Sequence, residues 1–247
     1  SIGRGTGVLY CLWSLWRGRG RLCLRDQPLR IDPSVMLRLV RVSLGGIGQM
    51  LIATASWMVL MWIVARFGKA AVAGYTVAIR LLMFTILPAW GLSNAAATLT
   101  GQNLGAGNPE RAERAVWLTG LYNMVFMVLV TAFCVFFGET MLRPFELTPS
   151  VEPFARDSLR IIAYGYVFYA WAMVMMQAFN GAGDTMTPTK LNVLCFWMVQ
   201  IPMAWLLSVQ AGLGPPGVFW SVMGAESLLA VVSMVVFRRG YWKTRAV

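Results

Sequence analysis

Amide, hydroxyl, aromatic and thioether side chains recur at helical spacing on long apolar segments of this sequence. In the segment 161–183 the spacing i, i+3, i+7, i+11 and i+14 places five of them on one face of a helix: Tyr166, Tyr169, Met173, Gln177 and Asn180. Polar groups are costly against lipid, so this face is expected to turn inward. Aromatic rings attract organic cations and flexible methionines adapt to different shapes, which suits a cavity for varied ligands. Hydrogen bonding between helices is the alternative role for the same residues.

Two other apolar segments repeat this pattern. Gln49 and Ser56 lie seven residues apart in the segment 42–65, so they share a helix face, and a similar set lies between 191 and 205. The candidate residues for a substrate cavity are therefore Gln49, Ser56, Tyr166, Tyr169, Met173, Gln177, Asn180, Asn192, Gln200 and Met203.

Two charged residues lie within apolar segments. With helices entering near Val72 and Pro216, Arg80 and Glu226 lie at similar depths of roughly 12 and roughly 15 Å. Ionisable groups inside a membrane are rare and pair with one another or mark functional sites. We therefore expect an Arg80–Glu226 ion pair, with a structural role favoured over a proton-carrying one.

A glycine-rich stretch, GQNLGAGNPER, raises the question of phosphate binding. A Walker-type loop needs a lysine and a hydroxyl residue directly after its glycines, and neither is present. The dinucleotide pattern G-x-G-x-x-G is absent as well, so no nucleotide partner is expected. Gly101, Gly105 and Gly107 instead suit a turn between two helices, and Asn108-Pro109 suits the start of the second.

Metal, disulfide and histidine chemistry are also poorly supported. The chain has no histidine, and its four cysteines show no C-x-x-C spacing. The ten acidic residues are scattered along the sequence, which argues against an Asp-rich metal site of a membrane-embedded transferase. We therefore expect no enzyme, no metal site and no cofactor.

The composition indicates a polytopic membrane protein of the all-α class. Hydrophobic residues make up 58% of the 247 residues and charged residues only 13%. A charge-free run needs about 20 residues to cross the hydrocarbon layer as a helix. Runs of that length or longer predict six spans: 42–65, 81–109, 115–138, 161–183, one span within the charge-free run 191–225, and a last one at about 216–237 that contains Glu226.

The net charge of +11 is explained by membrane topology. When the Arg-rich N-terminal segment is placed in the cytoplasm and the six spans alternate, most of the 21 Lys and Arg residues fall on the inner side. The sequence thus predicts a multi-pass protein of the plasma membrane (a bacterial inner membrane) with a cytoplasmic C-terminus. Lipid is the expected partner and nucleic acid is not.

Four parts follow from these boundaries. Residues 1–16 are interpreted as the end of a truncated transmembrane helix and 17–34 as a basic cytoplasmic linker. Residues 35–238 form the six-helix lobe, and 239–247 form a cytoplasmic tail. A short polar residue before a proline is typical of a helix start, and four such pairs agree with the hydropathy: Asp32-Pro33, Asn108-Pro109, Thr148-Pro149 and Thr187-Pro188.

Two prolines fall inside predicted spans. Pro88 and Pro202 each remove one helical hydrogen bond and free a carbonyl about one turn earlier. A packed kink is one interpretation, and an irregular stretch that lines a watery cavity is the other.

Five segments in order resemble the multidrug and toxic-compound extrusion (MATE) family of transporters. ATLTGQNLGAGNPERAERAV resembles the loop after the family's eighth helix, and FNGAGDTMTPT the loop between helices ten and eleven. IGRGTGVLY is similar to the end of helix six, VARFGKAAVAGYTVAIRL to the join of helices seven and eight, and FRRGYW to the end after helix twelve. The matches cover nearly the whole chain.

The resemblance implies the C-terminal half of a twelve-helix antiporter that expels organic, often cationic compounds in exchange for Na⁺ or H⁺. Such transporters alternate access between two six-helix lobes, so the fragment alone is not expected to transport, and the missing N-terminal lobe is its expected partner. Some branches of the family carry an acid in the stretches that match 50–57 and 169–177, where this chain has none. The coupling-ion site is therefore expected in the missing half.

Two other functions stay open from the sequence. A flippase for lipid-linked oligosaccharides has a related fold, but a more cationic cavity is expected there than Arg80 alone provides. A structural membrane subunit without transport activity is the second alternative.

Overall fold

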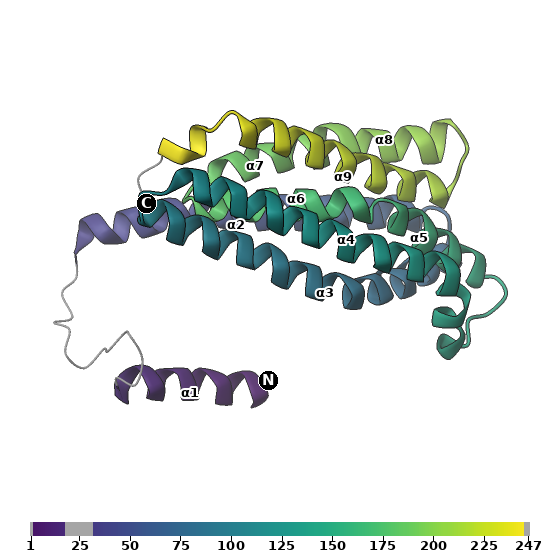
Figure 1. The fold of residues 1–247 in the computed structure, drawn as a ribbon. Coiled ribbons are helices and arrows are strands. Elements are labelled where there is room, and N and C mark those ends of the chain that lie inside the picture. Colours follow the sequence, from purple (N-terminus) through teal and green to yellow (C-terminus); the bar gives the residue numbers. More distant parts are fainter. Residues whose placement is uncertain (1, 18–31, 245–247) are drawn as a thin grey trace. The chain divides into compact units, whose positions relative to one another are not determined.

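The structure is a computed structural model that describes residues 2–17 and 32–244 (Figure 1). The chain divides into two units, residues 1–41 and 42–247. The first unit contains α1 (Ile2–Arg17) and the beginning of α2 (Pro33–Ala65). Most of the predicted linker at 17–34 lies outside the described residues.

The described part of the second unit is built from helices and has no strand, which confirms the all-α class. Five of its helical segments are long and apolar enough to cross a membrane, and α5 with α6 forms a sixth span bent by 57°. The helices after α2 are α3 (Lys69–Gly105), α4 (Pro109–Leu142), α5 (Glu152–Tyr164), α6 (Tyr166–Gly181), α7 (Met186–Asn192), α8 (Ile201–Trp205) and α9 (Pro215–Arg238). Short 3-10 turns lie at Arg143–Phe145 and Tyr241–Thr244, and π-helical stretches lie at Val193–Gln200 and Leu206–Gln210.

Helix α6 lies at the centre of the lobe and packs against α3, α4 and α9 (Figure 1). The small residues of these helices allow the close approach, since van der Waals packing drives helix association in lipid. Gly120 on α4 faces the Trp171 ring, and Gly181 at the end of α6 faces the backbone of Ala97 on α3. At both positions a methyl group would overlap its neighbour.

Substituting Gly181 by alanine is expected to lower stability by about 1–3 kcal/mol, because the new methyl group would meet the rigid backbone of Ala97 rather than a movable side chain. Thermal unfolding of the purified protein in detergent measures the effect. Gly91→Ala on α3 is the matched control, since a methyl group there meets no atom within 4 Å. Equal thermal midpoints for the two variants would contradict the prediction.

Two of the four expected helix starts are confirmed. Helix α2 begins at Pro33, and the Asp32 carboxylate accepts hydrogen bonds from the Ser34 hydroxyl at 2.7 Å and the Ser34 N–H at 2.9 Å. These bonds, above all the one from the Ser34 hydroxyl, lower the pKa of Asp32. Helix α4 begins at Pro109, but the Asn108 side chain donates to the carbonyl of Ala106 instead of capping the helix.

The other two predicted starts are wrong by a few residues. Helix α5 begins at Glu152 rather than at Pro149, after a turn at Thr148. Helix α7 begins at Met186, one residue before Thr187, because the Asp184 carboxylate accepts hydrogen bonds from the N–H and hydroxyl of Thr187. An acidic residue three positions earlier thus replaces the expected threonine cap.

The two prolines within spans have different effects. Helix α3 continues through Pro88 without interruption. Pro202 lies at the start of α8, between the two π-helical stretches of this span. Wide turns of this kind are frequent at functional sites, and the first of them contributes to the cavity described below.

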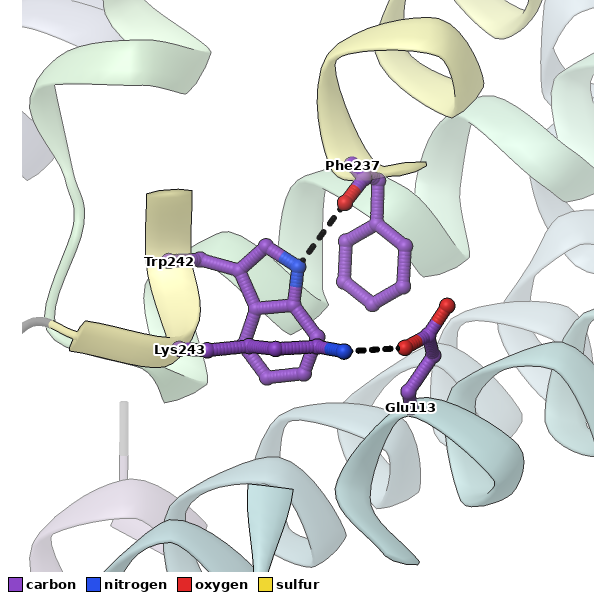
Figure 2. A network of polar contacts seen from close by, with 4 residues as sticks. All are labelled: Glu113, Phe237, Trp242 and Lys243. Atoms are coloured by element: carbon purple, nitrogen blue, oxygen red, sulfur yellow. Dashed lines mark hydrogen bonds and ion pairs between the residues drawn. The ribbon is translucent and has the colours of Figure 1, made fainter. Parts of the chain in front are cut away.

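The residues after α9 fold back onto the lobe (Figure 2). Trp242 is 1% exposed, stacks on Phe237 at a ring distance of 4.6 Å, and donates its indole N–H to the Phe237 carbonyl at 2.9 Å. The Lys243 ammonium forms an ion pair with Glu113 on α4, with 2.5 Å between Nζ and Oε2. The start of the predicted tail therefore joins the C-terminal end of α9 to the N-terminal end of α4.

Candidate functional site

A cavity of about 520 Å³ lies within the lobe, which we call the lobe cavity. Its walls come from α2, α3, α6, the π-helical stretch 193–200 and α9. The exposed lining residues lie on α2 and α3, so the cavity opens between these two helices: Ala53, Trp57, Met83 and Trp90. A volume of this size accommodates a small organic molecule.

Nine of the ten candidate residues from the sequence line the lobe cavity. They are Gln49, Ser56, Tyr166, Tyr169, Met173, Gln177, Asn180, Asn192 and Gln200. The exception is Met203, whose terminal methyl group lies against Gly224 on α9. The missing side chain at Gly224 leaves the space that Met203 fills, and the sequence of one helix cannot show this.

Aromatic residues of α2, α3 and the π-helical stretch also line the cavity, and the sequence analysis missed them. They are Trp57, Tyr75, Trp90 and Phe196. A helical stripe was available as a signal: Tyr75, Ile79, Leu82, Ile86 and Trp90 follow each other at intervals of three or four residues. It was overlooked because the charge-free run begins only after Arg80 and divides the stripe.

Four amide side chains form a continuous hydrogen-bonded chain at the cavity wall. Gln177 donates to Asn94 at 2.5 Å and accepts from Asn180 at 3.0 Å. Gln49 donates to Asn180 at 3.1 Å and to the carbonyl of Thr185 at 3.0 Å. The chain joins α3, α6 and α2, and three of its four amides line the cavity: Gln49, Gln177 and Asn180.

Single hydrogen bonds join other helices around the cavity, two of them between α2 and the π-helical stretch Val193–Gln200 and one between α6 and α3. The Ser56 hydroxyl donates to the Gln200 side chain at 3.0 Å, and the Trp197 indole donates to the Ile52 carbonyl at 3.1 Å. Tyr166 donates to the Leu82 carbonyl at 3.3 Å. These bonds keep polar groups satisfied away from water and fix the orientation of the walls.

Glu226 lines the cavity from α9, and the predicted ion pair with Arg80 is not formed. Oε2 of Glu226 is buried and has no hydrogen-bond partner. Within the described residues the ion pairs are Arg156–Glu139 and Lys243–Glu113. Arg80 and Glu226 each lie roughly 16 Å from the N-terminal end of their own helix, but Arg80 is on an exposed face of α3 and is not among the residues that line the cavity.

A metal ion has no evident protein site in the described part of the chain, where no three acidic or cysteine side chains come together. Glu226 is the one carboxylate among the residues that line the lobe cavity. A single buried carboxylate surrounded by aromatic rings, amides and methionines is suited to binding a positively charged organic group.

A model of the MatE family matches residues 47–206, which is more than half of the chain. The chain belongs to the MATE family of transporters. It is a multi-pass membrane protein, and transporters of this family are not enzymes. The matched region contains every candidate cavity residue and ends before Glu226.

Curated relatives are identical to the chain at about a quarter of the aligned positions. It is similar to the probable multidrug resistance protein NorM of Thermotoga maritima, with 26% identity over 180 residues that cover 73% of the chain and 39% of the relative. The probable multidrug resistance protein NorM of Pseudomonas aeruginosa is 28% identical over 240 residues, covering 95% and 47%. The chain spans less than half the length of these two relatives.

Solved MATE structures have the same fold. A MATE transporter in the bent conformation has a TM-score of 0.85 at 22% identity, with 94% of this chain and 52% of that chain covered. An outward-facing multidrug resistance MATE transporter has the same TM-score at 21% identity. The six-helix lobe predicted from the sequence is thus confirmed as a MATE fold.

Proposed function

We propose that the chain is the C-terminal lobe of an antiporter that expels organic cations across a bacterial inner membrane. In this proposal a second, N-terminal lobe of six helices faces it, and access alternates between the two sides of the membrane in exchange for Na⁺ or H⁺. The chain matches relatives named as probable multidrug resistance proteins and covers less than half of their length, which supports this proposal. We also propose that the C-terminus lies in the cytoplasm.

The observation that carries the proposal is the buried, unpartnered Glu226 carboxylate oxygen in a cavity with aromatic walls. Water screens charges little in such an interior, so an organic cation gains more from a carboxylate there than at the surface. Tyr169 on α6 and Trp57 on α2 contribute aromatic rings to the lining of the cavity. A carboxylate and two rings together favour a flat or bulky cation over a neutral molecule.

The coupling-ion site is proposed to lie in the N-terminal lobe. The stretches 50–57 and 169–177 contain no acid, and the cavity carboxylate is assigned here to the substrate. The amides, which carry no net charge, orient the polar groups of a ligand without restricting its class.

The test is efflux by the gene product that contains this chain, in a bacterial strain without its major pumps. Rhodamine B ethyl ester, a permanent cation, is expected to accumulate less in expressing cells than in cells without the gene. Collapse of the gradient that drives the exchange, Na⁺ or H⁺, is expected to abolish this difference in accumulation. Accumulation that is unchanged by expression, or efflux that needs neither gradient, would overturn the proposal.

A further inference from the structure

Two exposed arginines lie where α4 begins and α9 ends. Arg114 is the last charged residue before the charge-free run 115–138 of α4, and Arg238 is the first after the charge-free run 227–237 of α9. Among the described residues neither arginine takes part in an ion pair. Both therefore lie where an apolar segment meets the polar headgroup layer of a membrane.

Trp117 of α4 connects the two arginines. The guanidinium carbon of Arg238 lies over the Trp117 ring at 5.6 Å from its centroid. Arg114 precedes Trp117 by three residues, so their side chains are neighbours on the surface of α4. The ring is fixed in turn by Trp171 of α6 at 5.5 Å and by Phe237 at 6.0 Å. An arginine from each of two helices thus borders one well-held ring.

The acidic residues nearby do not neutralise this pair. Glu113 is bound by Lys243 in the ion pair described above, with 2.5 Å between Nζ and Oε2 (Figure 2). Glu110 lies one turn before Arg114 and forms no ion pair within the described part of the chain. The ends of the two helices carry five basic side chains against these two acids: Arg111, Arg114, Arg238, Arg239 and Lys243. This excess of positive charge attracts an anion from outside the lobe.

The surface that continues from the arginines suits lipid. The exposed residues of α4 between 115 and 138 are all aliphatic or aromatic. An exposed apolar row leads from each arginine along its helix: Leu118 and Leu121 on α4, and Val235 and Val231 on α9. The mouth of the lobe cavity lies elsewhere, between α2 and α3. A ligand that fits both the arginines and these rows has an anionic head and long apolar chains.

We propose that Arg114 and Arg238 bind the phosphate of an anionic phospholipid whose acyl chains lie along the exposed rows of α4 and α9. A planar guanidinium forms two parallel hydrogen bonds to a phosphate, and the basic excess favours a lipid with net negative charge over a zwitterionic one. The lipid joins the ends of α4 and α9, as the Lys243–Glu113 pair does. The inference goes beyond the proposed function and does not depend on the transported compound.

Native mass spectrometry of the purified gene product that contains this chain tests the site. The protein in detergent is titrated with dioleoyl phosphatidylglycerol or dioleoyl phosphatidylcholine, and the Kd of the first bound lipid is measured. The unaltered protein is expected to bind phosphatidylglycerol about tenfold more tightly. Arg238→Gln and Arg114→Gln are each expected to raise that Kd about fivefold and to leave the Kd of phosphatidylcholine within about twofold. Arg238→Lys, which keeps the charge but not the planar fork, is expected to lose less.

Arg111→Gln is the matched control. It removes the same charge from the same end of α4, but Arg111 points about 120° around the helix from Trp117. Its Kd for phosphatidylglycerol is expected to stay within about twofold. Equal losses for Arg111→Gln and Arg238→Gln would show diffuse attraction without a defined site and overturn the inference, as would equal affinities of the unaltered protein for the two lipids. Displacement of the lipid by glycerol phosphate would assign the site to a soluble anion and overturn it as well.

Binding of rhodamine B ethyl ester, followed by fluorescence anisotropy in lipid nanodiscs, separates this inference from the proposed function. Arg238 is not among the residues that line the lobe cavity, so Arg238→Gln is expected to leave the Kd of the ester unchanged. Loss of ester binding together with lipid preference in this variant would show a general disturbance of the lobe and overturn the lipid site. Failure of the unaltered protein to bind the ester would contradict the proposed function and leave the lipid site standing.

Discussion

Replacement of Glu226 by glutamine is expected to weaken the binding of rhodamine B ethyl ester by about 10- to 100-fold. The substitution keeps the size and shape of the side chain and removes its charge. Oε2 of Glu226 is buried without a partner, so no neighbouring cation of the lobe compensates for it in the ligand-free state. An organic cation in the cavity gains this interaction in full, and the variant loses it.

Three comparisons separate a lost charge from a disturbed structure. Glu226→Asp keeps the charge and is expected to bind the ester more tightly than Glu226→Gln does. Glu139→Gln removes a carboxylate that forms an exposed ion pair with Arg156 and is expected to leave the Kd unchanged. A neutral dye of similar size should bind equally to all variants, and a loss of its binding in Glu226→Gln would contradict the assignment.

Replacement of Trp242 by alanine is expected to destabilise the lobe by about 3–5 kcal/mol. The indole is 1% exposed, and its partner Phe237 packs edge-on against Trp117 and Phe179, so the alanine variant leaves a cavity in a core that joins α9, α4 and α6 (Figure 2). The ion pair between Lys243 and Glu113 contributes at most about 1 kcal/mol, since both side chains are 30% exposed.

Thermal unfolding in detergent, followed by the fraction of monodisperse protein, measures the effect of the Trp242 substitution. Trp220→Ala on α9 is the control, because that indole is 42% exposed and its removal opens no comparable space. Equal losses of stability in the two variants would show that the residues after α9 do not anchor the lobe. A Lys243→Ala variant as unstable as Trp242→Ala would show that the ion pair, and not the stacking, dominates.

The sequence by itself determined the fold class, the presence of the long apolar helices and most of the cavity residues, but not the starts of the spans, since α3 begins at Lys69 and α5 at Glu152. Each of these follows from local properties: the length of charge-free runs and the spacing of polar residues along one helix. The Tyr166–Asn180 face is an example, since a residue's direction around its own helix depends only on its position in the chain. Family motifs such as FNGAGDTMTPT are also local, because they consist of neighbouring residues in the sequence, and they indicated the correct family.

Other features were decided only by the tertiary structure. Arg80 and Glu226 lie equally far from the N-terminal ends of their helices, but the packing of α3 turns the arginine roughly 110° away from the cavity-facing side of that helix. Met203 fills the space beside Gly224 on α9, and Trp57 of α2 and Trp90 of α3 line the cavity because these two helices flank its mouth. Depth and periodicity are properties of one helix, whereas pairing and cavity lining depend on how neighbouring helices are rotated against each other, which distant residues determine.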